Sequence, residues 1–213
     1  MRGHLRSGRS FAVTLLAGLL SAAAVAGAGQ AKAPPPSSTC PAQPPLSQPF
    51  LPFGDSASYF LVPGGSMESA RMSGWTLGGG VASVPGNETF YVNSARDKRS
   101  LAVPVASSAT SPQVCVALTD PVMRFFAQNT GAASSTLRVE VLYNNAAGQA
   151  SSLVIARLAG GAHWATAPIW ILANAQAAAN PDGTTKVAFK FTAEGSGGNW
   201  KIDDVYVDPR KGR

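Results

Sequence analysis

The sequence is poor in the residues on which many catalytic and metal sites depend. Its 213 residues include two histidines and two cysteines, and charged residues make up 13% of the chain. His163 is the only histidine outside the N-terminal segment. A serine-type hydrolase needs a base for its nucleophile, and a zinc site needs several His or Cys ligands. We therefore expect neither of these sites.

Two further catalytic arrangements are missing. The motif Gly-x-Ser-x-Gly does not occur, because residues 194–198 begin with glutamate where the motif has glycine. A glycosidase needs two carboxylates that face each other across a cleft, and the glutamates of this chain lie in separate segments. The sequence predicts a protein that is not an enzyme.

The charge distribution argues against a nucleic-acid partner. The formal net charge of +6 is concentrated at the two ends of the chain. Between Phe50 and Pro209, ten lysines and arginines stand against eleven aspartates and glutamates, so this part is close to neutral. Nucleic-acid binding needs a basic face that displaces counterions, and the short cluster at residues 96–99 is typical of a solvated turn.

The N-terminal segment has the features of a secretory signal. Arg2, Arg6 and Arg9 form a positive region, and residues 11–28 are uncharged and rich in Ala, Leu and Val. Small residues place a cleavage site after Ala28, which predicts a secreted, extracellular protein, with the bacterial cell surface as one location. The alternative is a retained membrane anchor, although residues 11–28 are short for a span. After cleavage we expect no stable membrane insertion.

Composition divides the rest of the chain into three parts. Residues 29–52 are dominated by Pro, Ala, Ser and Gln, which favours an extended arm without a core of its own. Residues 53–209 alternate short runs of Val, Leu, Phe and Tyr with Gly, Pro, Asn and Asp, and residues 210–213 form a basic tail. The pattern of residues 53–209 predicts an all-β fold, a single antiparallel β-sandwich that follows the signal peptide and the Pro-rich arm.

Alternation of apolar and polar residues supports this fold class. In residues 137–143, Leu137, Val139 and Val141 share one face, and Arg138 lies on the other. The candidate strands are residues 59–62, 89–92, 101–103, 114–118, 123–128, 135–143, 150–158, 167–172, 185–192 and 200–207.

The two cysteines are expected to pair. Cys40 lies in the arm and Cys115 in a predicted strand. An exported chain folds in an oxidising compartment, which favours a disulfide between them. Such a bond would fasten the arm to the sandwich.

Two sequence motifs resemble those of galactose-binding-like jelly-roll domains, the β-sandwich superfamily that includes many carbohydrate-binding modules of bacterial secreted proteins. Many of these modules begin with a Gly-Asp-Phe-Glu-like motif and a Gly-Trp pair. Residues 65–68 (Gly-Ser-Met-Glu) and 74–75 (Gly-Trp) are similar to these. The modules end with a strand that reads aromatic-x-Ile-Asp-Asp-Val, as residues 200–205 do. The resemblance covers most of residues 53–209 and implies a jelly-roll fold.

The resemblance also implies one structural calcium. In such domains the first and last strands are neighbours, and the ion lies where the glutamate of the first motif meets an aspartate of the last. In this chain those residues are Glu68, Asp203 and Asp204. Calcium prefers oxygen ligands and accepts backbone carbonyls beside carboxylates. An alternative is that the two aspartates accept hydrogen bonds from loop amides or pair with Arg71.

Carbohydrate-binding modules usually bind sugars by stacking exposed aromatic rings on the pyranose faces. The resemblance therefore implies ligand-binding roles for Trp75, Trp164, Tyr91 and Tyr143, with a polysaccharide or cell-envelope glycan as the partner. The sequence predicts a secreted, non-catalytic binding module. The alternative is a structural or adhesion spacer of the cell envelope without a small ligand, in which the tryptophans are buried.

Overall fold

The computed structural model describes residues 40, 43–117, 121–167, 170–171, 179–180 and 183–209. The chain divides into two units, Met1–Pro36 and Ser37–Arg213, and all described residues belong to the second. The predicted signal segment, most of the arm and the basic tail lie outside the described residues. In the part that is described, no helix is long and apolar enough to cross a membrane.

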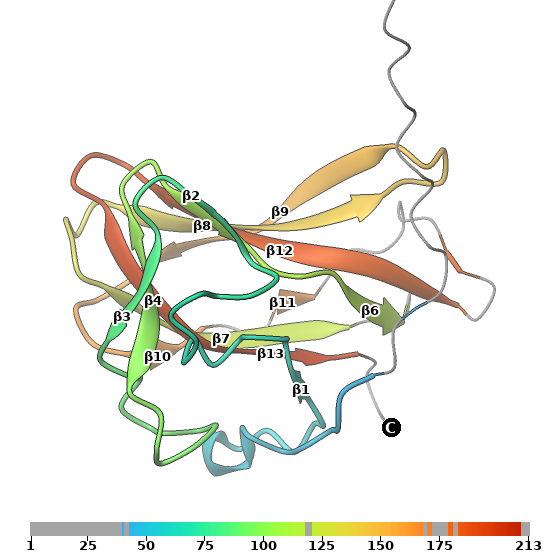
Figure 1. Cartoon of the computed structure of the whole chain (residues 1–213), viewed down its shortest axis with the longest axis horizontal. Coiled ribbons are helices and arrows are strands. Elements are labelled where there is room, and N and C mark those ends of the chain that lie inside the picture. Colours follow the sequence, from blue (N-terminus) through green and yellow to red (C-terminus); the bar gives the residue numbers. More distant parts are fainter. Residues whose placement is uncertain are drawn as a thin grey trace, which may run out of the picture. The chain divides into compact units, whose positions relative to one another are not determined.

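The described unit consists of two antiparallel β-sheets, which confirms the predicted all-β sandwich (Figure 1). One sheet has seven strands in the order β10-β7-β13-β4-β3, in which β1 also pairs with β13 and β11 with β7. Its strands are β1 (Phe60–Leu61), β3 (Ala82–Pro85), β4 (Arg99–Pro104), β7 (Val122–Asn129), β10 (Ala165–Thr166), β11 (Trp170–Ile171) and β13 (Asn199–Asp208).

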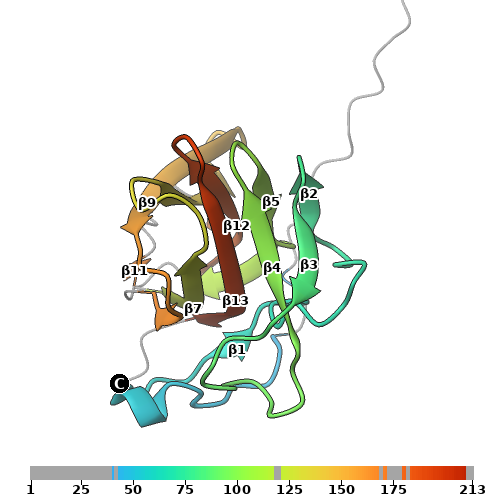
Figure 2. The ribbon, with the colours of Figure 1, turned by 90° about the vertical axis from the view of Figure 1, so that its left-hand side faces the viewer.

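The other sheet has six strands in the order β2-β5-β12-β8-β9, and β6 also pairs with β12. Its strands are β2 (Thr76–Gly78), β5 (Ser108–Thr110), β6 (Val114–Ala117), β8 (Thr136–Asn144), β9 (Ala150–Ala159) and β12 (Thr184–Glu194). Figure 2 shows β2 and β3 at one edge of the sandwich and β9 and β11 at the other. A short 3-10 helix, η1 (Leu51–Phe53), lies below the seven-stranded sheet in Figure 1.

The alternation read from the sequence determines which side chains form the core. In β8, Leu137, Val139 and Val141 are buried in the main hydrophobic cluster, and Arg138 faces outward. Val139 and Val141 lie opposite Phe191 and Phe189 of β12. Residues 89–92, predicted as a strand, instead form a turn in the loop between β3 and β4. This prediction was wrong because the carboxylate of Glu88 accepts hydrogen bonds from the backbone N–H groups of Phe90 and Val92, which therefore do not pair with a neighbouring strand.

The first and last strands of the sandwich are neighbours, as the resemblance implies. Phe60 of β1 lies opposite Val207 of β13. Beyond β1 the backbone N–H of Val205 donates to the carbonyl of Gly65 at 3.0 Å. The Gly-Ser-Met-Glu segment and the Ile-Asp-Asp-Val strand are therefore in direct contact, although some 135 residues separate Glu68 from Asp203.

The folded unit begins before Phe53, the boundary expected from composition. Ser47 pairs with Tyr59 in an isolated β-bridge, and Phe50 is fully buried. Phe50 forms a second aromatic cluster with Tyr59, Phe126 and Tyr206. The guanidinium of Arg124 lies over the ring of Phe50, with its central carbon 4.4 Å from the ring centroid. The last residues of the Pro-rich arm thus pack as part of the domain.

A disulfide joins Cys40 to Cys115, as predicted from the cysteine count. It connects the arm to β6 and closes a sequence separation of 75 residues. Both cysteines are partly buried, and no described cysteine is free. Closing a loop of this length restricts the unfolded chain by about 4 kcal/mol on the chain-entropy account.

Candidate functional site

A β-bulge in β13 explains why two aspartates stand side by side in an apolar strand. Asp203 lies opposite Phe126 of β7, and Tyr206 lies opposite Arg124, so β13 has one extra residue between these pairs. The backbone of Asp204 is in the left-handed region with φ 49°. A bulge of this kind re-aims side chains. Both carboxylates consequently meet the loop between β3 and β4, residues 86–98.

The two aspartates hold this loop at two points. The Oδ2 atom of Asp203 accepts the backbone N–H of Glu88 at 3.0 Å, and the Oδ2 atom of Asp204 accepts that of Asn93 at 3.0 Å. Hydrogen bonds from loop amides are the alternative to calcium that the sequence offered for these two aspartates. Arg71 is exposed, and none of the salt bridges among the described residues joins it to either aspartate.

Three further carboxylates surround the same loop. Glu88 is fully buried and accepts the backbone N–H groups of Phe90 and, at 2.7 Å, Val92. Asp97 accepts the side-chain amide of Asn93 at 2.7 Å. Glu68 accepts two backbone N–H groups from the end of the loop, those of Lys98 at 2.8 Å and Arg99 at 2.7 Å. We call these five acids, Glu68, Glu88, Asp97, Asp203 and Asp204, the carboxylate cluster.

Burial and mutual repulsion make ionisation of this cluster costly. Burial raises the pKa of Asp203 to about 9, and the charge of Asp204 contributes to the rise. Burial also raises the pKa of Asp204 to about 7, and Glu88, Asp97 and Glu68 add repulsion. The pKa values of Glu88 and Asp97 are raised by burial as well. A bound cation would relieve this repulsion.

One member of the carboxylate cluster has a buried oxygen atom that is available to a cation. Asp204 is buried, and its Oδ1 atom has no hydrogen-bond partner. None of the salt bridges in the described part of the chain involves a member of the cluster. The described residues contain no group of three His, Cys, Asp or Glu side chains arranged to hold a metal ion. An ion at Asp204 would therefore need backbone carbonyls or water among its ligands.

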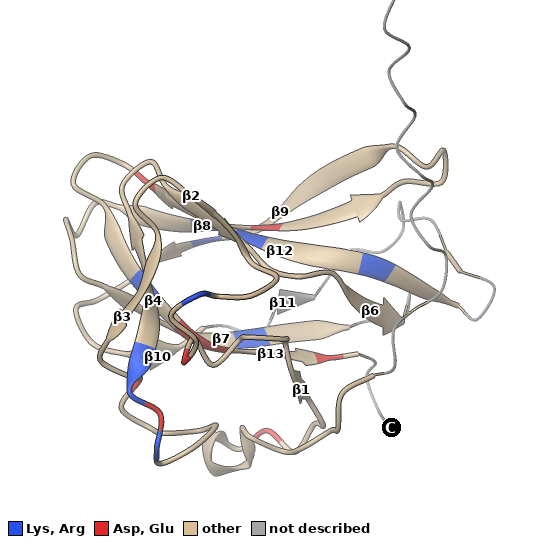
Figure 3. Ribbon diagram, viewed as in Figure 1, with Lys and Arg blue, Asp and Glu red and all other residues tan. Residues whose placement is uncertain are grey.

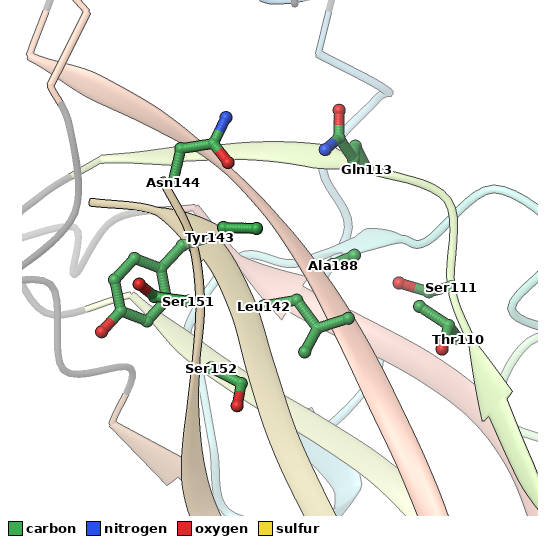
Figure 4. Close-up of a pocket in the computed structure, with 10 residues that line it drawn as sticks. Thr110, Ser111, Gln113, Leu142, Tyr143, Asn144, Ser151, Ser152 and Ala188 are labelled. Atoms are coloured by element: carbon green, nitrogen blue, oxygen red, sulfur yellow. The ribbon is translucent and has the colours of Figure 1, made fainter. Parts of the chain in front are cut away.

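A pocket of about 500 Å³ lies on the six-stranded sheet, on the side away from the seven-stranded sheet (Figure 4). Leu142 of β8 and Ala188 of β12 lie directly opposite each other and form an apolar part of its lining. The rest of the lining is mostly hydroxyl and amide side chains and contains no charged group: Thr110, Ser111, Gln113, Tyr143, Asn144, Ala150, Ser151 and Ser152. The pocket therefore offers hydrogen-bond donors and acceptors without a fixed charge.

The structure does not gather the four predicted ligand-binding aromatics on one surface. Trp75 is buried in the main core, where it stacks on Phe191 and donates its Nε1–H to the carbonyl of Pro63 at 2.9 Å. Its ring is therefore not available to an external ligand. A Gly-rich neighbourhood in the sequence does not distinguish a loop from the edge of the core, so the burial of Trp75 was not visible in the sequence.

Tyr143 alone of the four lines the pocket. In Figure 4 its side chain leaves β8 in the opposite direction from Leu142, and only 8% of Tyr143 is exposed. Tyr143 also belongs to the main hydrophobic cluster. It thus borders the pocket without presenting an open ring face.

Tyr91 and Trp164 belong to the seven-stranded side of the domain. Trp164 is half-buried against the second aromatic cluster. Tyr91 lies in the β3–β4 loop, is 51% exposed and has φ 53°. Two further exposed rings, which no sequence motif indicated, are Phe53 and Phe90, whose centroids are 5.2 Å apart. The pocket residues Gln113 and Ser152 were also missed, since isolated polar residues near strand ends carry no specific signal.

No protein-family model matches this chain. No curated protein matches it either. Several solved structures are similar to it, and carbohydrate-binding modules of families 22, 61 and 16 are among them.

Three of these structures illustrate the extent of the similarity. The family 61 module solved with β-1,4-galactotriose is 14% identical, with a TM-score of 0.43, and the match covers 69% of this chain and 96% of that module. The CBM22-1 xylan-binding domain from Paenibacillus barcinonensis is 14% identical, with a TM-score of 0.48 and coverages of 69% and 93%. The enzymatically active domain of tailspike protein 4 from bacteriophage CBA120 is 18% identical, with a TM-score of 0.48, and the match covers 68% of this chain and 20% of that one.

Proposed function

We propose that this protein is a secreted, non-catalytic module that binds an extracellular or cell-wall glycan in the pocket on the six-stranded sheet. The observation that carries the proposal is the pocket lining. Hydroxyl and amide groups from β5, β8 and β9 surround the apolar side chains of Leu142 and Ala188. A sugar unit has this mixed character, with hydroxyl groups at its rim and C–H groups on its faces, so both parts of the lining have a counterpart in the ligand.

The chemistry of the pocket supports binding without catalysis. Its lining has no carboxylate, histidine or cysteine, so it holds neither the pair of acids that glycoside hydrolysis needs nor a nucleophile with its base. The disulfide between Cys40 and Cys115 supports export, because such bonds persist in oxidising compartments.

Calcium is part of the proposal as a structural ion. Asp204 would be its central ligand, because its Oδ1 atom is buried and unpartnered. Asp203 and Glu68, the other two acids expected at the ion, already accept backbone hydrogen bonds with one or both oxygens. Since no three acids among the described residues are arranged to hold a metal ion, backbone carbonyls or water would supply further ligands. The ion would neutralise the repulsion between these acids and hold the β3–β4 loop to β13.

Binding is tested by isothermal titration calorimetry with soluble polysaccharides. Xylan and β-1,4-galactan are reasonable first polymers, since similar structures were solved as binders of these ligand types. The double variant Gln113→Ala/Asn144→Ala removes two pocket amides and should weaken binding at least tenfold. The matched control is Asn199→Ala, which removes an exposed amide at the start of β13 on the other sheet. If the double variant bound the polysaccharide as tightly as Asn199→Ala, the glycan site would not be at this pocket.

The second candidate function is the structural spacer of the cell envelope. One observation favours it: the spacer hypothesis requires buried tryptophans, and Trp200 and Trp75 are 1% and 8% exposed, whereas Trp164 is half-buried. A protein that binds no polysaccharide in the calorimetric panel, with tryptophan fluorescence that aqueous quenchers do not reach, would be a spacer.

A further inference from the structure

A group of apolar side chains is exposed where η1 meets the β3–β4 loop. The described residues expose seven large hydrophobic side chains, and four of them lie in these two segments: Leu51, Phe53, Phe90 and Tyr91. We call these four side chains the apolar patch. The ring centroids of Phe53 and Phe90 are 5.2 Å apart, so the two segments contact each other. Exposed apolar side chains that occur singly need no explanation, whereas a group of them marks an interaction surface.

The apolar patch rests on a fixed base. The buried ring of Phe126 lies beneath it, with its centroid 5.9 Å from that of Phe53 and 5.4 Å from that of Phe90. The carboxylate of Glu88 holds the loop by accepting the backbone N–H groups of Phe90 and Val92. The exposed rings are therefore presented to solvent by a loop whose backbone is held in place.

The β3–β4 loop separates its charges by sign. Residues 86–98 contain two acids and two bases, and all four are described. The acids, Glu88 and Asp97, are buried, whereas the bases, Arg96 and Lys98, are exposed. None of the salt bridges among the described residues involves either base. Figure 3 shows blue segments of this loop at the lower edge of the domain. The loop thus presents positive charge to solvent together with apolar side chains.

The two segments share one edge of the domain. Figures 1 and 2 both show η1 and the β3–β4 loop at the lower edge, beyond the seven-stranded sheet. Asp55, the one charged residue of residues 46–58, forms an ion pair with Arg124 at 2.9 Å. It therefore does not oppose the positive charge of the loop. The pocket lies on the other sheet, so a ligand bound there would leave this edge uncovered.

We infer that this edge binds reversibly to the surface of a bilayer that contains anionic phospholipid. The apolar patch would enter the boundary between headgroups and acyl chains, and Arg96 and Lys98 would contact the anionic headgroups. Peripheral binding of this kind depends on buried apolar area together with attraction to anionic lipid. The bilayer site is separate from the proposed glycan site and does not depend on it.

The geometry favours a lipid surface over a sugar or a protein. The rings of Phe53 and Phe90 are inclined by 78°, so they do not form a flat platform on which a sugar ring could stack. A large apolar side chain has about 200 Å² of surface, so four side chains that are roughly half exposed offer about 400 Å². A specific protein interface buries about 800 Å² on each partner. Reversible attachment to a bilayer needs less area, because insertion and charge act together.

The test is flotation of the exported protein with lipid vesicles at low salt and without divalent cations. Vesicles of phosphatidylglycerol and phosphatidylcholine in about equal parts should bind at least about tenfold more tightly than phosphatidylcholine alone. The double variant Arg96→Gln/Lys98→Gln should weaken this binding at least about tenfold. Tyr91→Asn should weaken it about fivefold through loss of inserted area, and asparagine tolerates the φ of 53° at this position.

Val154→Ser and Lys190→Gln are the matched controls, because they remove an exposed apolar side chain and a base from the six-stranded sheet. Both should bind the vesicles as the wild type does. All variants share the same N-terminal segment and basic tail, so differences between them report on the substituted positions. Thermal melts of each variant check that folding is retained.

Insertion is tested with an environment-sensitive fluorescent probe on Tyr91→Cys, since both native cysteines are in the disulfide. Its emission should shift to shorter wavelength on vesicle binding, and the same probe on Val154→Cys should not respond. Absence of binding to either vesicle, or binding that Tyr91→Asn weakens no more than Val154→Ser does, would overturn the inference. Loss of polysaccharide binding in Tyr91→Asn, without any vesicle binding, would assign the apolar patch to a glycan and would also overturn it.

Discussion

The carboxylate of Asp203 accepts a hydrogen bond from the backbone N–H of Glu88, a residue 115 positions earlier in the chain. The carboxylate of Glu88 in turn accepts backbone N–H groups of its own loop. The last strand therefore shapes the β3–β4 loop, and the same loop presents Phe90 and Tyr91 to solvent. This arrangement depends on several carboxylates that share a small buried volume, and their charge state should govern the stability of the domain.

Metal-free protein should become less stable as the pH rises. In chelator, the folded state holds protons on Asp203 and Asp204, whose pKa values of about 9 and about 7 exceed the unfolded value of 3.8. A raised carboxyl pKa gives stability that is complete below the unfolded pKa and is lost as the pH passes through the folded pKa. Thermal melts should therefore give a lower Tm at about pH 9 than at about pH 5. Asp203→Asn should flatten this dependence, and a Tm that increases over this interval would contradict the protonated state.

Calcium should reverse that trend if it binds the carboxylate cluster. At about pH 8 the ion would favour the ionised form, and a hundredfold excess over its Kd would stabilise the folded state by about 2.7 kcal/mol. Melts with calcium and with chelator measure the effect. Asp204→Asn should abolish it, whereas Asp208→Asn, on the same strand but outside the cluster, should retain it. A wild-type Tm that is the same with calcium and with chelator would count against the ion.

Gly65 should not tolerate a side chain. A Cβ atom at this position would lie 2.8 Å from the carbonyl oxygens of Val205 and Val62, closer than such atoms approach. Gly65→Ala should destabilise the domain by about 1–3 kcal/mol in urea unfolding, because the first motif and the last strand would be pushed apart. Gly161→Ala is the control, since nothing lies within 4 Å of its added Cβ. Equal stabilities of the two variants would argue against this contact.

Trp75 and Tyr91 should respond differently to substitution. Trp75→Ala leaves a cavity beside Phe191 and should cost about 3–5 kcal/mol of unfolding free energy. Tyr91→Ala removes a half-exposed ring and should change stability by less than about 0.5 kcal/mol. Chemical unfolding of both variants measures the difference. A marginal effect of Trp75→Ala would mean that this ring is not part of the core.

Loss of the disulfide should destabilise the domain without changing its fold. Cys115→Ser is expected to lower the unfolding free energy by about 4 kcal/mol, because the 75-residue loop is no longer closed. Circular dichroism should still show a β-rich protein. Thiol titration of the denatured, unreduced wild-type protein should find no free sulfhydryl, and two free thiols would rule the bond out.

The sandwich was predictable because its physical cause is local. Alternating apolar residues such as Leu137, Val139 and Val141 fix which face of a strand is buried, and that pattern is visible in the sequence. The neighbouring position of the first and last strands followed from two motifs, not from alternation. Short strands such as β2 and β3 escaped prediction, because three or four residues carry too little pattern.

The candidate site was less predictable, since its residues meet only through the fold. Asp203 and Asp204 were conspicuous as charges in an apolar strand, and Glu68 followed from the resemblance. Glu88 looked like an ordinary turn residue, and only the structure shows it buried beneath its own loop. The pocket residues come from separate strands of one sheet, and no spacing in the sequence relates Gln113 to Ser152.

The extra residue in β13 changes the parity of the strand. Before the bulge the core positions are even-numbered, Trp200 and Ile202, and after it they are odd-numbered, Val205 and Val207. Removing Asp204 would not simply delete one carboxylate. It would also remove the bulge, because Val205 and Val207 would then follow Ile202 in regular alternation on the core face and keep their places opposite β7. The bulge is thus what brings two adjacent carboxylates to the β3–β4 loop, and deletion of Asp204 should release this loop while the core positions of β13 are retained.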